Sequence, residues 1–373
     1  MKTICITEPC FDQSILVRTM SVLICIFLVQ PFAHAEDSAN KTPPEIASRA
    51  LDYLRKEGQR WIDRRECVSC HQIPAMVWSL NAAHGSGLSV ERTEVNDLAK
   101  WSTDHLHFVE SKDRADAECD DVLEKNTDTM AALLLALPPS ENEQSYLHAP
   151  DASLPECGNG SDDVQDQDSW RVTFADALIR NQNADGSWDP KGQLPSQKRD
   201  PQETRRVSTL WITYALLKEG QTEDDFKLAG ALAFVDEGAS EDNQPKSAEW
   251  WATRLLVADQ LGETTVVDRT RKILLSAQQN DGGWGWLLAD KSDALATGIV
   301  LYALSTIKPD SDAVKPPVVA AIQRATKFLG TTQLANGSWK VPGTKKNSRN
   351  RSVPTSNYWG TAWAVIGLLA ADH

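Results

Sequence analysis

From Pro43 onward, the sequence alternates between two kinds of helix-like segment. One kind carries an amphipathic stripe, with apolar residues recurring three and four positions apart, and the other is apolar or aromatic almost all round. Such alternation is expected where outer helices surround buried inner helices. The predicted outer and inner pairs are 44–61 with 72–85, 91–109 with 127–137, 169–182 with 203–218, 223–237 with 247–261, 266–279 with 293–307, and 318–332 with 356–371.

A similar turn follows three of the outer segments, within residues 177–188, 278–286 and 326–339. In each copy an apolar run ends near a Gln, a short polar turn carries Gly, and a Trp follows. Gly supplies the positive φ that ends a helix, and the Trp ring can cover the helix end. Three copies indicate a repeat, and no segment shows strand alternation bounded by turns. The sequence therefore predicts an all-α fold, an (α/α)6 toroid of six helical hairpins.

The Gln-x-x-x-Gly-x-Trp turns on paired helices resemble the QW repeats of squalene-hopene cyclases and of the wider terpenoid cyclase and protein prenyltransferase toroids. The resemblance implies an apolar central cavity and an apolar, isoprenoid-like small molecule as ligand. Aromatic residues of the inner segments are the candidates to line it: Trp78, Trp211, Tyr214, Trp250, Trp251, Tyr302, Tyr358, Trp359 and Trp363. The same rings could instead fill a core that has no cavity.

The acid that the resemblance would require is missing from the sequence. Cyclases of this family protonate their substrate with an Asp-x-Asp-Asp motif, and the closest string, residues 118–121, begins with Glu and lies in a predicted loop. Asp128 and Asp293 begin inner segments and are the weak catalytic candidates, although each also fits a helix-capping or first-turn residue. The Asp, Cys and His zinc set of the prenyltransferases is not matched either.

The N-terminus predicts export. Arg18 precedes an apolar core at 22–29, and Ala33-His34-Ala35 is a small-x-small cleavage site, which together are typical of a signal peptide. We expect a signal peptide at 1–35, a single toroid domain at 36–373, and a periplasmic or secreted protein with no stable transmembrane segment after cleavage. A retained N-terminal anchor is the alternative.

The first helix pair is joined by a different motif, Cys67-Val68-Ser69-Cys70-His71. This Cys-x-x-Cys-His spacing is typical of c-type haem attachment, with thioethers at Cys67 and Cys70 and His71 as the proximal iron ligand. His105, His107 and Met130 are the candidates for a distal ligand.

Three other interpretations of these cysteines stay open. Cys67, Cys70 and Cys119 could hold Zn²⁺ together with His71, His105 or His107. Cys119 and Cys157 could form a disulfide that is compatible with haem. Cys67 and Cys70 could form a local disulfide, or the motif could arise by chance.

Charge changes the picture in two ways. The formal net charge of −14 argues against a nucleic-acid partner, because phosphate binding needs a basic stripe. Residues 138–168 contain eight acidic residues and no Lys or Arg, and are predicted to be an insertion. Its Asp162, Asp163 and Asp166 could hold Mg²⁺, or Ca²⁺ together with Asp168, although solvated charge is favoured.

Taken together, the sequence predicts an exported toroid with a covalent haem, acting in electron transfer or redox chemistry with a redox partner protein beside an apolar cavity. The alternatives are a terpenoid or polyprenyl cyclase-type enzyme without the usual acid, and a non-catalytic lipid- or protein-binding toroid with zinc or a disulfide at Cys67 and Cys70. A glycan lyase or hydrolase is less favoured, because no convincing carboxylate pair is visible.

Overall fold

The computed structural model of the chain describes residues 41–68, 72–116, 118–139, 169–191, 197–237, 239, 244–307, 315–348 and 351–372. In these ranges it contains thirteen α-helices and no β-strand. The helices are α1 (Pro43–Arg65), α2 (Ile73–Gly85), α3 (Arg92–Thr103), α4 (Cys119–Glu124), α5 (Thr127–Ala136), α6 (Ser169–Arg180), α7 (Pro201–Lys218), α8 (Leu228–Glu237), α9 (Ala248–Gln260), α10 (Thr264–Ala277), α11 (Ala294–Thr306), α12 (Lys315–Thr332) and α13 (Pro354–Ala370).

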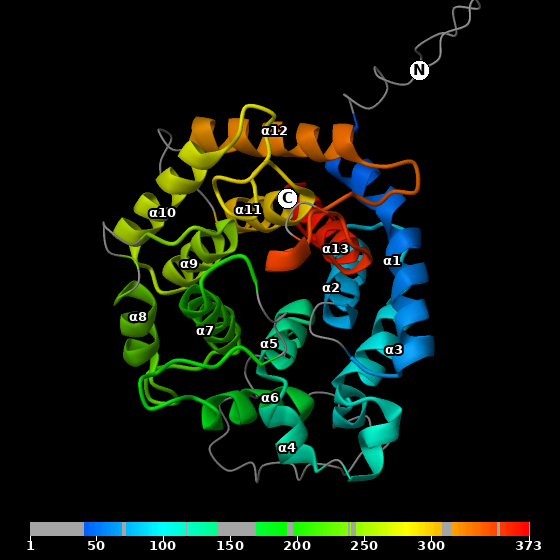
Figure 1. Cartoon of the computed structure of the whole chain (residues 1–373), viewed down its shortest axis with the longest axis vertical. Helices are drawn as coiled ribbons and strands as arrows, with labels where there is room; N and C mark the ends of the chain where they lie inside the picture. The colour runs from blue at the N-terminus through cyan, green and yellow to red at the C-terminus, as the bar shows by residue number, and fades with distance from the viewer. Residues whose placement is uncertain are drawn as a thin grey trace, which may run out of the picture.

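Six of these helices form a closed inner ring. Helices α2, α5, α7, α9, α11 and α13 contact one another in that order, and α13 contacts α2 again, while the remaining helices lie outside them (Figure 1). The predicted (α/α)6 toroid is therefore confirmed, and each of the six predicted pairs corresponds to an outer and an inner helix.

The second outer segment is shorter than predicted. Helix α3 ends at Thr103, and a 3₁₀ turn, η1 (His105–Phe108), follows it. The Asp104 side chain accepts a hydrogen bond from the Leu106 backbone N–H, and this cap starts the new turn where the helix was expected to continue.

The three Gln–Gly–Trp turns, residues 182–188, 278–284 and 333–339, make the same contacts. Each indole N–H donates to the carbonyl ten residues earlier on its own outer helix, and each Trp backbone N–H donates to a Thr hydroxyl on the next inner helix. The indole pairs are Trp188 with Leu178, Trp284 with Leu274 and Trp339 with Leu329, and the Thr acceptors are Thr209, Thr297 and Thr361. Each turn thus fixes an outer helix to its inner partner.

The Gln of each turn connects successive outer helices. Its amide N–H₂ donates both to the Gly carbonyl of its own turn and to a backbone carbonyl at or beside the next outer helix. These carbonyls are Lys227 for Gln182, Ala321 for Gln278 and Ile46 for Gln333. The last bond joins α12 to α1 and so closes the outer ring.

The Gly of each turn lies against the backbone of the next outer helix. Gly337 has a φ of 81°, and a Cβ built on it would lie 1.8 Å from the Arg49 carbonyl oxygen. Gly282 has a φ of 93° and the same relation to the Arg324 carbonyl oxygen, at 2.5 Å. These positions need glycine for both conformation and space.

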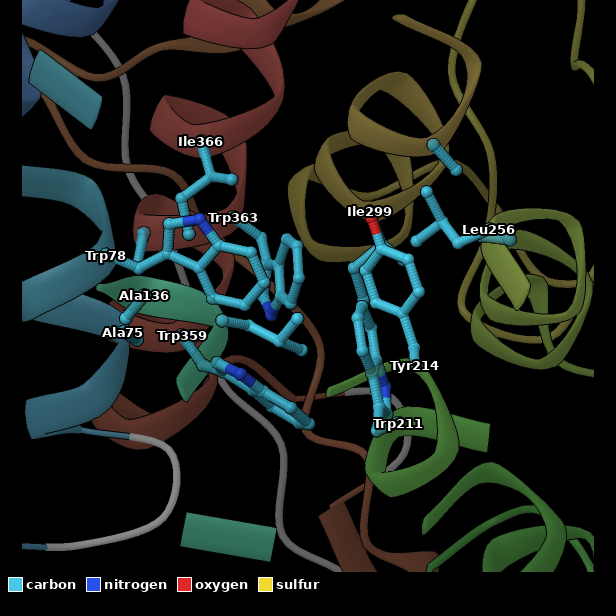
Figure 2. Close-up of a cluster of buried hydrophobic side chains, with 14 of the residues drawn as sticks. Ala75, Trp78, Ala136, Trp211, Tyr214, Leu256, Ile299, Trp359, Trp363 and Ile366 are labelled. Atoms are coloured by element: carbon cyan, nitrogen blue, oxygen red, sulfur yellow. The ribbon is translucent and has the colours of Figure 1, made fainter. Parts of the chain in front are cut away.

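Aromatic side chains fill the centre of the inner ring. Trp78, Trp211, Tyr302 and Trp363 come from four different helices, and their rings contact one another with centroids 5.2 to 6.4 Å apart (Figure 2). Tyr214 joins this group through Trp211. These rings, which were expected to line an apolar cavity, thus contact one another, and their role as cavity lining stays a prediction.

The other predicted lining residues lie around this cluster. Trp250 and Trp251 contact each other, and the Trp251 indole donates to the Pro245 carbonyl. Tyr358 donates to the Leu54 carbonyl on α1. Trp359 lies beside the central rings in Figure 2 and is 8% exposed.

Two predicted segments lie outside the described residues, namely the signal peptide at 1–35 and residues 140–168 of the acidic insertion. Among the described helices, none has both the length and the apolar character needed to cross a membrane.

We expect Gly337→Ala to lower the free energy of unfolding by about 2–5 kcal/mol, which combines the cost of a positive φ with that of overpacking against Arg49. Gly87→Ala is the matched control, because Gly87 also has a positive φ of 71° but nothing lies within 4 Å of an added Cβ. It should cost only about 1–2 kcal/mol. Urea unfolding measures both, and equal losses would contradict the role of the contact.

Candidate functional site

The inner helices α5, α7, α9, α11 and α13 begin at one face of the toroid, which we call the mouth. The loop from α6 to α7 crosses this face. Near its start, the Lys191 carbonyl accepts the Asp128 backbone N–H, and near its end the Lys198 backbone N–H donates to the Thr344 carbonyl in the α12–α13 loop. The Ala248 backbone N–H donates to the Trp286 carbonyl, which adds the α10–α11 loop. The loops at this face are therefore joined by backbone hydrogen bonds.

A buried ion pair orients one ring of the central cluster. Arg199, just before α7, pairs with Glu249 at the start of α9 through an Nη1–Oε2 distance of 2.6 Å, and both side chains are almost fully buried. The other Glu249 oxygen accepts a hydrogen bond from the Trp211 indole N–H at 3.0 Å. Because a buried charge needs a partner, Arg199 and Glu249 compensate each other, and the hydrogen bond from the Trp211 indole to Glu249 fixes that ring beside the start of α9.

A second cation lies beside the first. The Lys198 ammonium and the Arg199 guanidinium both face the Trp286 ring, at 5.6 and 5.0 Å from its centroid. Lys198 also pairs with Asp290 at 3.0 Å. Each cation thus has both a carboxylate and an aromatic face as neighbours.

Tyr302 is the partly exposed ring of the central cluster, and three buried indoles of the cluster and its surroundings keep a small exposed fraction. Trp78 and Trp211 are each 9% exposed and Trp359 is 8% exposed, whereas Trp250 and Trp251 are 1% exposed. Trp78 and Trp359 lie in the second turns of α2 and α13, and the indole of Trp211 reaches Glu249 at the start of α9. These three rings form what we call the aromatic floor of the mouth.

Asp293 is the N-cap of α11. One carboxylate oxygen accepts the Ala296 backbone N–H and the other accepts the Trp286 backbone N–H. Burial raises the pKa of the Asp293 carboxyl to about 6, against the opposing effect of these backbone hydrogen bonds. Of the two interpretations that the sequence allowed, the geometry is that of a capping residue.

Asp128 occupies a different position. It is the second residue of α5, where Asn126 holds the N-cap position, and it is 7% exposed. The adjacent Thr127 and Thr129 are buried, and their hydroxyl groups have no hydrogen-bond partner within the described structure. Asp128 is thus a buried carboxyl group in a polar environment at the mouth.

The mouth contains residues that the sequence analysis missed, above all Lys198, Arg199 and Glu249. A signal was present, since Glu203 and Glu249 are carboxylates at the starts of inner segments, which were expected to be buried. Glu203 accepts hydrogen bonds from the backbone N–H and hydroxyl of Ser247 at 2.7 and 2.6 Å, which ties α7 to α9.

Only the beginning of the Cys-x-x-Cys-His motif lies in the described residues. Cys67 is a buried free thiol, and burial raises its pKa, while Cys70 and His71 lie outside these residues. Cys119 is disulfide-bonded, and its partner lies outside the described residues. Cys157 also lies outside them. In this state Cys119 does not offer a thiolate to a metal. No group of three His, Cys, Asp or Glu residues in the described part could hold a metal ion.

One predicted distal histidine lies close to this motif. The His107 carbonyl accepts the Val68 backbone N–H, and the His107 ring stacks on Trp101 with its Nδ1 2.7 Å from the Trp101 carbonyl oxygen. His105 lies on the same 3₁₀ turn beside Asp104. Met130 is fully buried in α5. The haem and zinc assignments stay predictions.

No family model matches the sequence, and no curated protein matches it. Several solved structures match the fold. The unsaturated glucuronyl hydrolase of Bacillus sp. GL1, responsible for the degradation of glycosaminoglycan, has a TM-score of 0.50 and 13% identity, over 89% of this chain and 96% of that chain. Possible GH105 family members from Salmonella enterica and Klebsiella pneumoniae have TM-scores of 0.48 and 0.49 and 12% identity, over 95% of this chain and 98% of theirs. At such identities the likeness concerns the fold.

The predicted kinship with squalene cyclases was wrong, since the matching solved structure with a TM-score of 0.50 is an unsaturated glucuronyl hydrolase. The predicted functions were wrong as well. These are electron transfer through a haem, the cyclase-type alternative, and binding of an isoprenoid ligand. The physical reason is that a Gln–Gly–Trp turn fixes the packing of an outer helix against its inner partner and against the next outer helix. It carries no information about the chemistry at the mouth.

The buried Asp293 predicts a pH dependence of stability. Because its folded pKa of about 6 exceeds the ordinary 3.8, its stabilising contribution is fully present below about pH 4 and is lost as the pH rises through 6. Relative to Asp293→Asn, the wild type should lose on the order of 3 kcal/mol over this window. Urea unfolding of both proteins from pH 4 to 8 measures the difference, and parallel curves would disprove the shift.

The haem prediction has a direct measurement. Expression with a c-type maturation system should give a protein that keeps haem after denaturation, and Cys67→Ala with Cys70→Ala should abolish the denatured haem spectrum. A wild-type chain that carries no covalent haem under these conditions would refute the assignment.

Proposed function

We propose that this chain is a carbohydrate-processing enzyme that acts on an oligosaccharide at the mouth. The observation that carries the proposal is the placement of a buried carboxyl group, Asp128, at the same face as the aromatic floor. The toroid shared with a glucuronyl hydrolase adds support for a sugar ligand.

The aromatic floor suits the apolar side of a sugar ring. Trp78, Trp211 and Trp359 are buried residues that keep 8–9% of their surface exposed, and the C–H groups on one side of a pyranose pack on aromatic faces. The hydroxyl groups of the same sugar need polar partners, which the backbone groups and charged side chains of the loops at the mouth provide. An apolar isoprenoid would leave these polar groups without hydrogen bonds.

In this proposal Asp128 transfers the proton. A carboxylic acid can protonate the oxygen of the bond that breaks, and as a carboxylate it can take a proton from the attacking water. Asp293 is less suited, because both of its oxygens already accept backbone N–H groups. Glu249, held by Arg199, fixes Trp211 in the floor.

The proposal is tested with a panel of oligosaccharides that includes neutral chains, uronate-containing chains and chains with an unsaturated uronate at the non-reducing end. Reducing-end release measures cleavage in general. Loss of the ultraviolet absorbance of the unsaturated uronate measures attack on that sugar. If the wild type cleaves no member of the panel, the proposal is rejected.

Asp128→Asn should lower kcat/KM by about a hundredfold or more with little change in the fold, because it removes the proton-transferring group. Asp121→Asn is the matched control, since Asp121 is an exposed aspartate on the nearby helix α4 and should leave the rate unchanged. Equal activity of both variants would exclude Asp128 from the chemistry.

A further inference from the structure

The charge of the chain is distributed very unevenly. Residues 313–371 contain no Asp or Glu, although the chain as a whole has a net charge of −14. The same stretch contains eight basic residues, Lys315, Arg324, Lys327, Lys340, Lys345, Lys346, Arg349 and Arg351. The rest of the chain therefore carries −22, the difference between −14 and +8. The net charge of −14 was the argument against a nucleic-acid partner. It is a sum over the whole chain and does not show this local excess of positive charge.

Four of these cations, Lys340, Lys345, Lys346 and Arg351, lie in the described residues 340–348 and 351 between α12 and α13, which we call the basic loop. Of its described residues, Lys340, Lys346 and Arg351 are exposed and Lys345 is partly exposed. None of these four forms an ion pair with another described residue, whereas Lys191, Lys198 and Arg199 each have a carboxylate partner.

The basic loop borders the mouth. Its Thr344 carbonyl accepts the Lys198 backbone N–H at 2.8 Å, and Lys345 forms an isolated β-bridge with Gln197. Lys198 and Arg199, next in the chain, face Trp286. The loop is thus continuous with the proposed saccharide site, and its cations are on exposed or partly exposed residues beside it.

Hydrogen bonds hold the described part of the loop in place. The Gly343 backbone N–H donates to the Arg351 carbonyl, and the Val341 backbone N–H donates to the Asn357 side chain on α13. The Ser356 hydroxyl donates to the Val341 carbonyl at 2.6 Å. The cations are therefore carried on a backbone tied to the inner ring, which reduces the entropy lost when a ligand binds.

We propose that the basic loop is a docking surface for an acidic polysaccharide, whose carboxylate or sulfate groups contact the loop while one end of the chain enters the mouth. That the partner is a glycan rests on the proposed function. A single polysaccharide strand can follow one loop. A nucleic-acid duplex would instead bring its phosphates against the acidic remainder of the surface.

Binding of dextran sulfate, with uncharged dextran of equal length as reference, tests the proposal without any need for turnover. The triple variant Lys340→Gln, Lys345→Gln, Lys346→Gln should bind dextran sulfate about tenfold more weakly than wild type at low salt, with the difference shrinking as salt is added. The matched control, Lys56→Gln, Lys218→Gln, Lys272→Gln, removes the same charge from exposed lysines elsewhere and should stay within about twofold.

Equal weakening by both triple variants would overturn the proposal, because it would show that only the total charge matters. Absence of dextran sulfate binding by the wild type would overturn it as well. Tighter binding of a DNA duplex than of dextran sulfate at the same salt would assign the loop to nucleic acid. A chain that binds dextran sulfate through the loop but cleaves no saccharide would reject the proposed function and leave the docking surface standing.

Discussion

The side-chain amide of a glutamine, shared between its own turn and the next outer helix, is the interaction on which this toroid depends. Gln182, Gln278 and Gln333 each satisfy two backbone carbonyls, and in doing so they set the distance between neighbouring helix pairs. The second carbonyl lies just before or in the early turns of the next outer helix, while the first belongs to the glutamine's own turn. The same amide therefore closes a turn and joins two neighbouring helix pairs.

The same geometry explains why the polar chemistry lies at one face. Outer helices end and inner helices begin at the mouth, so the unpaired N–H groups of the inner helices converge there. Acidic residues such as Asp293 and Glu203 satisfy N–H groups at this face, and Arg199 compensates the charge of Glu249. In the centre, by contrast, aromatic rings from facing helices contact one another. The polar groups of the mouth thus lie at one end of an aromatic core.

Much of the fold could be predicted from the sequence, because its signals are local. The period of apolar residues and the Gly and Trp of each turn identified every helix pair. The sequence analysis missed the short helix α4, the late start of α8 at Leu228, and the break at Asp104, which depends on a single side-chain cap. The site could be predicted less well. Asp128 and Asp293 look alike in the sequence, and the bond from the Trp286 backbone that distinguishes Asp293 comes from a loop fold that no periodicity encodes.

The resemblance to cyclases failed for a related reason. The aromatic residues of the inner segments were identified correctly, but whether they surround a space depends on the distance between facing helices. That distance follows from how small residues pack between neighbours, as where Gly298 of α11 lies against Trp363 and Ala364 of α13. Such close approach brings the indoles together, and it becomes visible only once the ring is assembled.

The bond between Gln333 and Ile46 has a consequence for how the molecule forms, since it joins residues 287 positions apart. A chain emerging from the ribosome can complete each hairpin in turn, but it cannot finish the ring until its last outer helix has been made. Late closure of this kind raises the average sequence separation of native contacts and slows folding. It also brings the two ends of the toroid together, so the chain could be joined there and reopened in another loop without disturbing the order of the helices around the axis.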